Sequence, residues 1–393
     1  MDLIYLDHNA TTPVDPEVRE AMLPFLGPEF GNPSSAHPLG RKAREAVERA
    51  RAEVADLIGA QPREIIFTAS GTEASQLALL GCAEARRERL RGRRLRIVSF
   101  ALEHPATLRP LEELRRRGDE VILIPPDPRG VVQTDRMHAS LDERSGSADI
   151  VSLMHAHNET GVLQPVAETG RLARAGGILF HVDAAQTLAK VPVNVEGIGC
   201  DLLSIAGHKI YAPKGVGALY VRSGTALRPL LPGAGQEGGL RGGTENVPGI
   251  VALGAACQLA KRRLAGGEPM RLAALRERLW EGLRAAVPGI ARTGQRAETL
   301  PNTLHVRFPN ARGNAVLEAA PQVAASTGSA CHSGIDKPPA AIIALGIPEE
   351  EALGSVRLSL GHGTDAAAVD TAVAHLARGW RIACGGNENV PGR

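Results

Sequence analysis

Residues 201–221 read DLLSIAGHKIYAPKGVGALYV, and this segment indicates the class of fold. Two apolar runs within it, Asp201–Ile205 and Val216–Val221, have the composition of buried strands. Lys209 lies just beyond the end of the first run, beside a glycine and a histidine. Partial desolvation at the carboxyl end of a central strand favours the neutral amine that forms Schiff bases. Taken alone, Lys209 is weak evidence, because most lysines are solvated surface groups.

The same alternation of apolar runs and amphipathic stretches extends over the chain up to about residue 260. Five further runs resemble buried strands: Ile65–Thr68, Arg96–Phe100, Val121–Ile124, Ile150–His155 and Ile178–Val182. Between strands, Glu73–Arg91 and Pro165–Ala175 suit crossover helices. We therefore predict an α/β fold with a mostly parallel central sheet flanked by helices. Ligands of such sheets bind beyond the carboxyl ends of the strands.

The pattern changes at about Met270. The later segments comprise helix patterns at Arg271–Ala286, Pro338–Leu345 and Asp365–Ile382, and strand patterns at Thr303–Phe308 and Ser355–Leu360. This order predicts a smaller α+β domain. We expect a large domain at residues 14–260, a small domain formed by residues 1–13 and 261–384, and a flexible tail at 385–393.

Composition excludes several classes of protein. The chain has 393 residues, 22% of them charged, and a formal net charge of +2. Bulk charge therefore gives no reason to expect a nucleic-acid or membrane partner. The chain has no run of about 18 apolar residues, and its first residues, MDLIYLDHNATTP, are acidic where a secretory signal would be basic. We expect a cytoplasmic protein.

The cysteines are few, odd in number and widely scattered: Cys82, Cys200, Cys257, Cys331 and Cys384. This distribution is typical of free thiols in a reducing compartment. Neither a CxxC pair nor an HExxH motif occurs, so we expect no structural zinc site.

Asp183 directly follows the run Ile178–Val182, so a carboxylate and a lysine, Lys209, follow two separate strands and can reach one ligand. Pyridoxal 5'-phosphate requires such a pair, because a carboxylate keeps its ring nitrogen protonated and the ring then accepts electrons from a substrate carbanion. Taken singly, Asp183 is more simply explained as a loop or N-cap aspartate. Together, the two residues favour a cofactor site.

Other polar residues also follow predicted strands. In the SGTE motif, Gly71 allows close approach of the backbone, and Thr72 begins a helix whose free N–H groups suit a phosphate; plain N-capping is the alternative. His104 can lie flat on a cofactor ring and move protons, or it is a structural histidine. Asn158 and Gln186 can hydrogen-bond the phenolic oxygen of the cofactor, or they are turn residues.

The order of these motifs resembles that of the cysteine desulfurase family, within the class V aminotransferases of fold type I. The motifs that carry the resemblance so far are SGTE (70–73), EH (103–104), NETG (158–161), DAAQ (183–186) and GHK (207–209). Five longer motifs agree with it: YLDHNATTP (5–13), FGNPSS (30–35), GQEGGLRGGTENVPGI (235–250), STGSACHSG (326–334) and VRLSLG (356–361). The resemblance covers about residues 4 to 380 and implies conversion of L-cysteine to L-alanine, with the sulfur carried as an enzyme persulfide.

The resemblance also implies roles for individual residues. It makes Lys209 the lysine that binds pyridoxal 5'-phosphate, Asp183 the partner of the ring nitrogen, and His104 the stacking and proton-transferring residue. The other implied cofactor contacts are Gly71, Thr72, Asn158, Gln186, His208 and Thr244.

Substrate and subunit contacts follow from the same resemblance. Arg357 matches the arginine that binds the substrate carboxylate, where a bidentate guanidinium serves better than a lysine. Asn32 and Asn158 are the further implied substrate contacts. Thr244 matches a residue that reaches the phosphate of the neighbouring subunit, which implies a homodimer.

Cys331 lies among small residues and next to His332. Small residues on both sides suit a loop that carries a thiol into the site and out to an acceptor protein, and His332 favours the nucleophilic thiolate. A buried free cysteine in a glycine-rich turn is the alternative. Within the family resemblance, Cys331 is the nucleophile that takes the sulfur.

The sequence departs from the family pattern at two places. Ala206 occupies a position that often holds a phosphate-binding serine, so Ser204 is considered as a substitute. The residues after Cys384 do not resemble the extension by which iron–sulfur-assembly members dock their scaffold.

Three other functions are considered. The ACHS and RGGTENVPGI motifs also resemble those of selenocysteine lyases, which release selenium from L-selenocysteine and form L-alanine. An aminotransferase or other lyase on the same fold would make Cys331 incidental. A non-catalytic sulfur-relay subunit is disfavoured by the intact set of Lys209, Asp183, His104 and Arg357.

Overall fold

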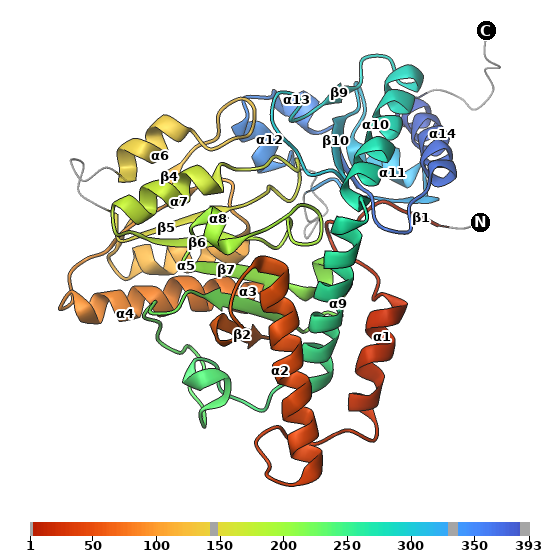
Figure 1. Cartoon of the computed structure of the whole chain (residues 1–393). Coiled ribbons are helices and arrows are strands. Elements are labelled where there is room, and N and C mark those ends of the chain that lie inside the picture. Colours follow the sequence, from red (N-terminus) through yellow and green to blue (C-terminus); the bar gives the residue numbers. More distant parts are fainter. Residues whose placement is uncertain (1–2, 142–147, 329–336, 386–393) are drawn as a thin grey trace.

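The computed structural model describes residues 3–141, 148–328 and 337–385. Its larger sheet has seven strands in the order β2-β8-β7-β6-β5-β3-β4 (Figure 1). These are β2 (Ile65–Thr68), β3 (Arg96–Phe100), β4 (Glu120–Ile124), β5 (Ile150–Met154), β6 (Leu179–Asp183), β7 (Leu202–Ala206) and β8 (Gly217–Val221). Strand β8 is antiparallel to both of its neighbours, and all the other neighbours are parallel. The prediction of a mostly parallel sheet is confirmed.

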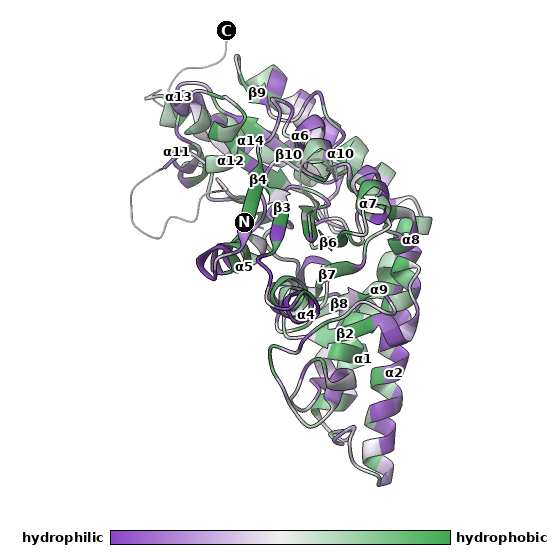
Figure 2. Ribbon diagram, turned by 90° about the vertical axis from the view of Figure 1, so that its left-hand side faces the viewer, coloured by the Kyte–Doolittle hydropathy of each residue, from purple (hydrophilic) through white to green (hydrophobic). Residues whose placement is uncertain are grey.

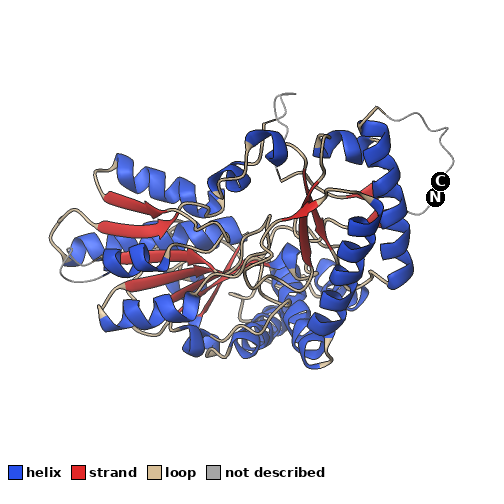
Figure 3. Cartoon of the chain, turned by 90° about the horizontal axis from the view of Figure 1, so that it is seen from above, coloured by secondary structure: helices blue, strands red, loops and turns tan. Residues whose placement is uncertain are grey.

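Helices cover both faces of this sheet, as the view from above shows (Figure 3). Consecutive strand residues alternate between two apolar clusters: Ile150 packs with α3, α4 and α5, whereas Val151 packs with helices on the opposite face. The first group consists of α3 (Gly71–Gln76), α4 (Cys82–Arg89) and α5 (Pro105–Arg116). The second consists of α1 (Pro16–Met22), α2 (Pro38–Ile58), α6 (Thr134–Leu141), α7 (Val166–Ala175), α8 (Val195–Ile198) and α9 (Val247–Ala265). Because both faces are covered, strands β5, β7 and β8 are buried along their whole length.

The amphipathic character of α2 explains its place against the sheet. Its buried residues recur at intervals of three and four, as in Ala43, Val47, Ala50 and Val54, so they form one stripe of the helix. Figure 2 shows the consequence: α2 carries both green and purple stretches, whereas the neighbouring strands are largely green. The helix ends at Gly59, whose φ of 71° is left-handed and favours glycine.

A second, smaller sheet belongs to the later part of the chain. Its antiparallel strands are β9 (Ala291–Arg292), β10 (Thr303–Arg307) and β12 (Ser355–Ser359), in the order β12-β10-β9. The helices of this part are α10 (Glu268–Ala286), α11 (Gly313–Glu318), α12 (Ala340–Ala344), α13 (Glu349–Ala352) and α14 (Ala366–Ala383). A separate apolar cluster fills it, in which Leu6 packs with residues between 272 and 377. The expected domain boundaries at 14, 261 and 385 stay a prediction.

The N-terminal segment lies in this second part. Strand β1 (Ile4–Tyr5) pairs in parallel with β11 (Val323–Ala324), and Ser359 N donates to Leu6 O at 2.7 Å. Both β1 and β11 have only two residues, so no periodicity in the sequence reveals them.

The predicted helix Glu73–Arg91 differs in detail from the observed one. The helix begins at Gly71, and a wide π-turn at Leu77–Gly81 (η3) interrupts it. A Cβ atom on Gly81 would lie 2.6 Å from the carbonyl oxygen of Arg228, so the chain passes too closely here for a side chain. The other predicted elements are confirmed, with ends that shift by at most three residues. In the described part of the chain, no helix is long and apolar enough to cross a membrane.

Candidate active site

Lys209 lies at the end of the short 3-10 helix η5 (Gly207–Lys209), directly after β7. A Cβ on Gly207 would come within 2.8 Å of Val216 O, so this tight approach requires glycine. The Nζ atom of Lys209 donates to the carbonyl oxygens of Asn9 at 2.6 Å and Ala10 at 2.7 Å. Burial, together with the charge of Arg357, lowers the pKa of Lys209 to about 8. The amine is thus prepared for nucleophilic attack close to neutral pH.

Asp183 is the last residue of β6 and is only 8% exposed. Its Oδ1 accepts a hydrogen bond from Ala185 N at 2.9 Å, whereas no described residue donates to Oδ2. Burial raises the pKa of this carboxyl group, and the Ala185 N–H and the charges of His104 and Lys209 oppose that rise. A buried carboxylate with one free oxygen is stabilised by a cationic partner.

His104 is the N-cap of α5, and its Nδ1 accepts from Ala106 N at 3.1 Å. In the neutral ring the proton is therefore on Nε2. Burial lowers the pKa of His104, as does the charge of Lys209, although much of its surface is exposed. A side chain on the wall of a concave site can have both a pKa that burial lowers and an exposed surface. Asp183 and Lys209 end or follow the neighbouring strands β6 and β7, and the charges of both residues affect the pKa of His104, so the three side chains lie within electrostatic reach of one another.

These residues fit pyridoxal 5'-phosphate. The free oxygen of Asp183 suits a protonated ring nitrogen, and Lys209 suits the aldehyde. Gly71 and Thr72 are the first residues of α3, so their N–H groups have no intrahelical partner and suit a phosphate. A Cβ on Gly71 would lie 2.9 Å from Cβ of Ala206, so these two backbones meet without room for a larger side chain.

His208 and Ser204, which the sequence suggested for binding a phosphate, differ in their contacts. Nδ1 of His208 lies 3.1 Å from Oγ1 of Thr11, and burial lowers its pKa to about 4, so the ring is neutral at pH 7. Ser204 is 1% exposed, and its hydroxyl is hydrogen bonded to Ser75 and His181. Because that hydroxyl is already bonded inside the fold, Ser204 does not replace the serine absent at Ala206.

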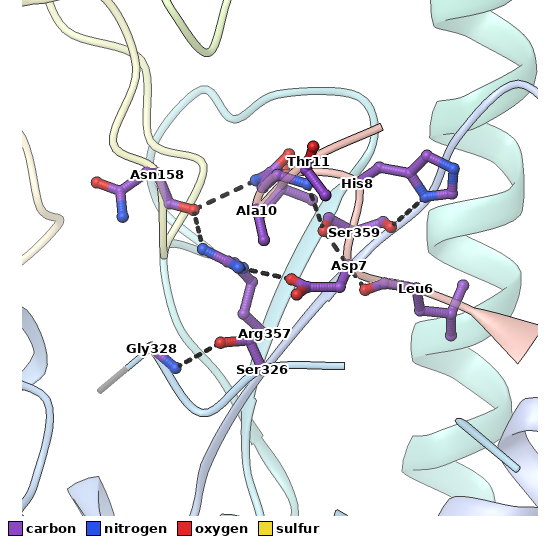
Figure 4. Close-up of polar contacts among 12 residues, drawn as sticks. Leu6, Asp7, His8, Ala10, Thr11, Asn158, Ser326, Gly328, Arg357 and Ser359 are labelled. Carbon is purple, nitrogen blue, oxygen red and sulfur yellow. Dashed lines mark hydrogen bonds and ion pairs between the residues drawn. The ribbon is translucent and has the colours of Figure 1, made fainter. Parts of the chain in front are cut away.

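Arg357, on β12, is 5% exposed and joins the two sheets. Its Nη2 donates to Oδ1 of Asp7 at 2.6 Å, and its Nη1 donates to the carbonyl oxygen of Asn158 at 3.1 Å (Figure 4). The main chain of Arg357 pairs with Ser326, with Arg357 N donating to Ser326 O at 2.7 Å. The segment that leads to Cys331 therefore starts beside the main chain of β12. Cys331 itself lies outside the described residues.

The two amides that the sequence suggested differ in their contacts. The side-chain amide of Asn158 points away from Arg357 (Figure 4). Gln186 is 6% exposed; its Nε2 donates to Asn9 O at 3.1 Å, and its Oε1 accepts from Lys190 Nζ at 2.8 Å.

No contact joins Asn32 or Thr244 to Lys209, Asp183 or His104 among the described residues of one chain. Asn32 belongs to the segment between α1 and α2, and its Oδ1 accepts from Ser34 N. This segment lies at the end of the molecule opposite to the small sheet (Figure 1). Thr244 is exposed. Its loop is tied to the start of α3 by Arg241 Nε, which donates to Glu73 Oε1 at 2.9 Å.

Sequence reasoning assigned no role to Asp7, Asn9 or Lys190. Asn9 is 1% exposed, and its main-chain and side-chain atoms bond to Lys190, Lys209 and Gln186. The motif YLDHNATTP was the available signal for Asp7 and Asn9. Lys190 has no signal of its own in the sequence.

One large hollow of the described surface is separate from the site itself. It has a volume of about 1260 Å³ and lies beside His8, Thr12, Tyr211 and the start of α14, without contact to Asp183, His104 or Arg357. Chemistry, not size, therefore identifies the active site.

Comparison with known proteins agrees with this site. The family model for class-V aminotransferases matches residues 4–371. A cysteine desulfurase IscS of Anaeromyxobacter dehalogenans is 43% identical over 94% of this chain and 90% of its own length. Among solved structures, a NifS-like protein has a TM-score of 0.87 at 36% identity, covering 95% of this chain and 98% of its own. SspA in complex with cysteine has a TM-score of 0.79 at 33% identity, covering 91% of this chain and 98% of its own.

These matches confirm the resemblance and the fold type I architecture predicted from the motifs. The chain belongs to the class-V aminotransferases and, within them, to the cysteine desulfurase family.

Proposed function

We propose that this enzyme converts L-cysteine to L-alanine, carries the sulfur as a persulfide on Cys331 and delivers it to an acceptor protein. The observation that supports this most is the meeting of Lys209, Asp183 and His104 with Arg357, which comes from the other sheet. Pyridoxal 5'-phosphate, held by Lys209, supplies an electron sink for the negative charge that develops on the α-carbon of the substrate.

Three side chains act around the ring. Asp183 keeps the ring nitrogen protonated, because a buried carboxylate stabilises a cation beside it. His104 would lie against the cofactor ring and shuttle protons. Its lowered pKa keeps the imidazole neutral at pH 7, so the imidazole can accept a proton. Lys209 would hold the cofactor and would also serve as the general base for the α-proton of the substrate, a task that its pKa of about 8 suits.

Arg357 binds the substrate carboxylate, and its two present partners hold the plane of the guanidinium. Asp7 accepts from Nη2, and the carbonyl of Asn158 accepts from Nη1, so the group is oriented before substrate arrives. We assign Asn32 an assisting role. Since the segment between α1 and α2 lies away from the small sheet within one chain, a second subunit would have to bring Asn32 to the site.

The remaining cofactor contacts complete the proposal. Gly71, Thr72 and His208 surround the phosphate, and Asn158 and Gln186 donate to the phenolic oxygen. Thr244 of one subunit reaches the phosphate of the other, so the active form is a homodimer. We further propose that the enzyme acts in the cytoplasm.

Sulfur transfer is a nucleophilic substitution at sulfur. The Cys331 thiolate attacks the sulfur of the bound substrate, and a sulfur–sulfur bond forms as the bond between Cβ and sulfur breaks. The electron pair of the broken bond returns to the carbon skeleton, which takes up protons and leaves as alanine. The sulfur remains on Cys331 as a persulfide for the acceptor.

Mass spectrometry of the protein after exposure to L-cysteine tests this function. We expect one added sulfur on the peptide that contains Cys331, no added sulfur on the peptide with the exposed Cys384, and one alanine released per sulfur bound. Alanine formed without any sulfur on Cys331 would contradict the persulfide step. Pyruvate formed from alanine and a keto acid, with no desulfuration, would indicate an aminotransferase.

A further inference from the structure

Lys190 is a buried lysine in the active site with an unusual set of partners. It lies after β6, is 7% exposed, and its Nζ donates to Asn9 Oδ1 at 2.9 Å and to Gln186 Oε1 at 2.8 Å. Among the described residues no carboxylate forms an ion pair with it. Burial, together with the charges of Lys209 and Arg357, lowers its pKa well below the ordinary lysine value. A buried amine without an anionic partner lowers stability, so a function offsets its cost.

The hydrogen bonds of Lys190 decide how two amides are oriented. An ammonium group only donates, and a neutral amine still has two N–H groups, so in both states Lys190 can serve the two oxygens. Asn9 therefore turns its Nδ2 the other way, where it donates to Thr303 Oγ1 at 2.9 Å and to Asn158 O at 3.3 Å. Gln186 likewise turns its Nε2 away from Lys190.

The same network reaches the lysine of the cofactor. The main-chain oxygen of Asn9 accepts from Gln186 Nε2 at 3.1 Å and from Lys209 Nζ at 2.6 Å. The Gln186 amide has two N–H groups, and Asn9 takes one of them. The second N–H remains for a ligand beside Lys209.

We propose that Lys190 is a positioning residue that fixes the Gln186 amide, so that Gln186 presents an N–H group and not its carbonyl oxygen to the phenolic oxygen of the cofactor. This inference rests on the proposed cofactor pose. Without Lys190 the Gln186 amide loses one of the two hydrogen bonds that orient it and keeps only the one to Asn9 O. If the amide then turned by half a turn, its oxygen would repel the anionic oxygen of the cofactor.

The absorbance of the lysine-bound cofactor reports directly whether the Gln186 amide donates to the phenolic oxygen. A donor to the phenolic oxygen competes with the proton of the lysine–cofactor linkage, so it lowers the pKa of that linkage. In the holoenzyme without substrate, Lys190→Met is expected to raise this spectroscopic pKa by about one unit, the effect of losing one hydrogen bond to an ionised oxygen. Lys261→Met, which removes an exposed lysine paired with Asp56, is the matched control and is expected to leave it unchanged.

A double-mutant cycle with Gln186→Met separates positioning from charge. If Lys190 acts through Gln186, each single variant raises the spectroscopic pKa, and Lys190→Met adds no further shift in the Gln186→Met background. Additive shifts would overturn the proposal, because they would show a direct effect of the Lys190 charge. An unchanged pKa in a folded, cofactor-loaded Lys190→Met protein would also overturn it. Absence of a cofactor band in the wild-type protein would instead contradict the proposed function.

If Lys190→Met fails to fold, Gln186→Glu supplies the test. Lys190 still holds the side chain of residue 186, which then lacks an N–H group, and an unchanged spectroscopic pKa refutes the proposed donor.

Discussion

Nη2 of Arg357 donates to Oδ1 of Asp7 at 2.6 Å, so residues 350 positions apart in the chain meet at the substrate end of the site. Asp7 and the Asn158 carbonyl occupy one Nη atom each, whereas the buried Nε has no hydrogen-bond partner among the described residues. The guanidinium is thus held in one plane but retains donor capacity for a carboxylate.

Replacing Arg357 by Lys is expected to raise KM for L-cysteine by about 10- to 100-fold, because a single ammonium cannot reproduce the planar, bidentate hydrogen bonds of a guanidinium. Steady-state kinetics with alanine as the measured product checks this. Arg278→Lys, in an exposed ion pair with Asp370, is the control and should leave KM unchanged. An unchanged KM in Arg357→Lys would remove Arg357 from substrate binding.

Cofactor uptake by protein stripped of its cofactor should depend on pH through Lys209. Only the unprotonated amine attacks an aldehyde, and burial lowers the pKa of Lys209 to about 8. The uptake rate should therefore rise about tenfold per unit below pH 8 and become constant above it, as followed by absorbance between about pH 6 and 10. A rate that still rises tenfold per unit at about pH 9.5 would mean that Lys209 titrates as an ordinary lysine.

Lys209→Ala should abolish both the absorbance band of the lysine-bound cofactor and turnover, because no other described amine has the same place after β7. Absorbance spectra and alanine formation measure the two effects. The exposed Lys214, five residues later on the same loop, offers a matched control: Lys214→Ala should retain the band. Turnover by Lys209→Ala at more than a trace of the wild-type rate would refute its catalytic role.

Asp183→Asn is expected to lower kcat by about 100-fold or more while leaving stability equal or higher. The neutral amide no longer holds a proton on the ring nitrogen, a loss typical of removing one preorganised electrostatic group. At the same time the buried charge disappears, which favours the folded state. Kinetics and thermal unfolding together distinguish this from a structural role, and Asp56→Asn at an exposed position serves as the control. A large fall in Tm with unchanged kcat would contradict the assignment.

The sequence revealed the residues whose place follows from local patterns. Asp183, Lys209 and Glu103-His104 each come just after an apolar run, and parallel strands bring their carboxyl ends to one edge, so their meeting is predictable. Their electrostatic coupling in the structure agrees with that prediction.

What the sequence could not reveal depends on contacts between distant parts of the chain. Asp7 and Asn9 reach the site because the two-residue strand β1 pairs with β11, more than 300 residues later, and no periodicity encodes that pairing. Lys190 looks like any surface lysine, since its burial results from packing of Asn9 and Gln186 around it. The short strand β9 and the π-turn in the helix after β2 were also beyond pattern reading, because each arises from tertiary packing.

Cys331→Ser should abolish sulfur transfer to an acceptor thiol, because a serine hydroxyl at neutral pH is neither the nucleophile nor the carrier that a thiolate is. Cofactor binding should persist, since the groups around the ring are untouched, so the absorbance band serves as an internal control for folding. Cys384→Ser is the matched variant: this exposed thiol lies near the carbonyls of Pro309 and Asn310 and should be dispensable. Sulfide release and alanine formation are measured together, with and without a thiol acceptor.

If Cys331→Ser formed alanine and sulfide from L-cysteine at the wild-type rate, the covalent step would be refuted. If it lost activity toward L-cysteine but kept it toward L-selenocysteine, the selenol would be leaving without a cysteine nucleophile, as expected for a better leaving group.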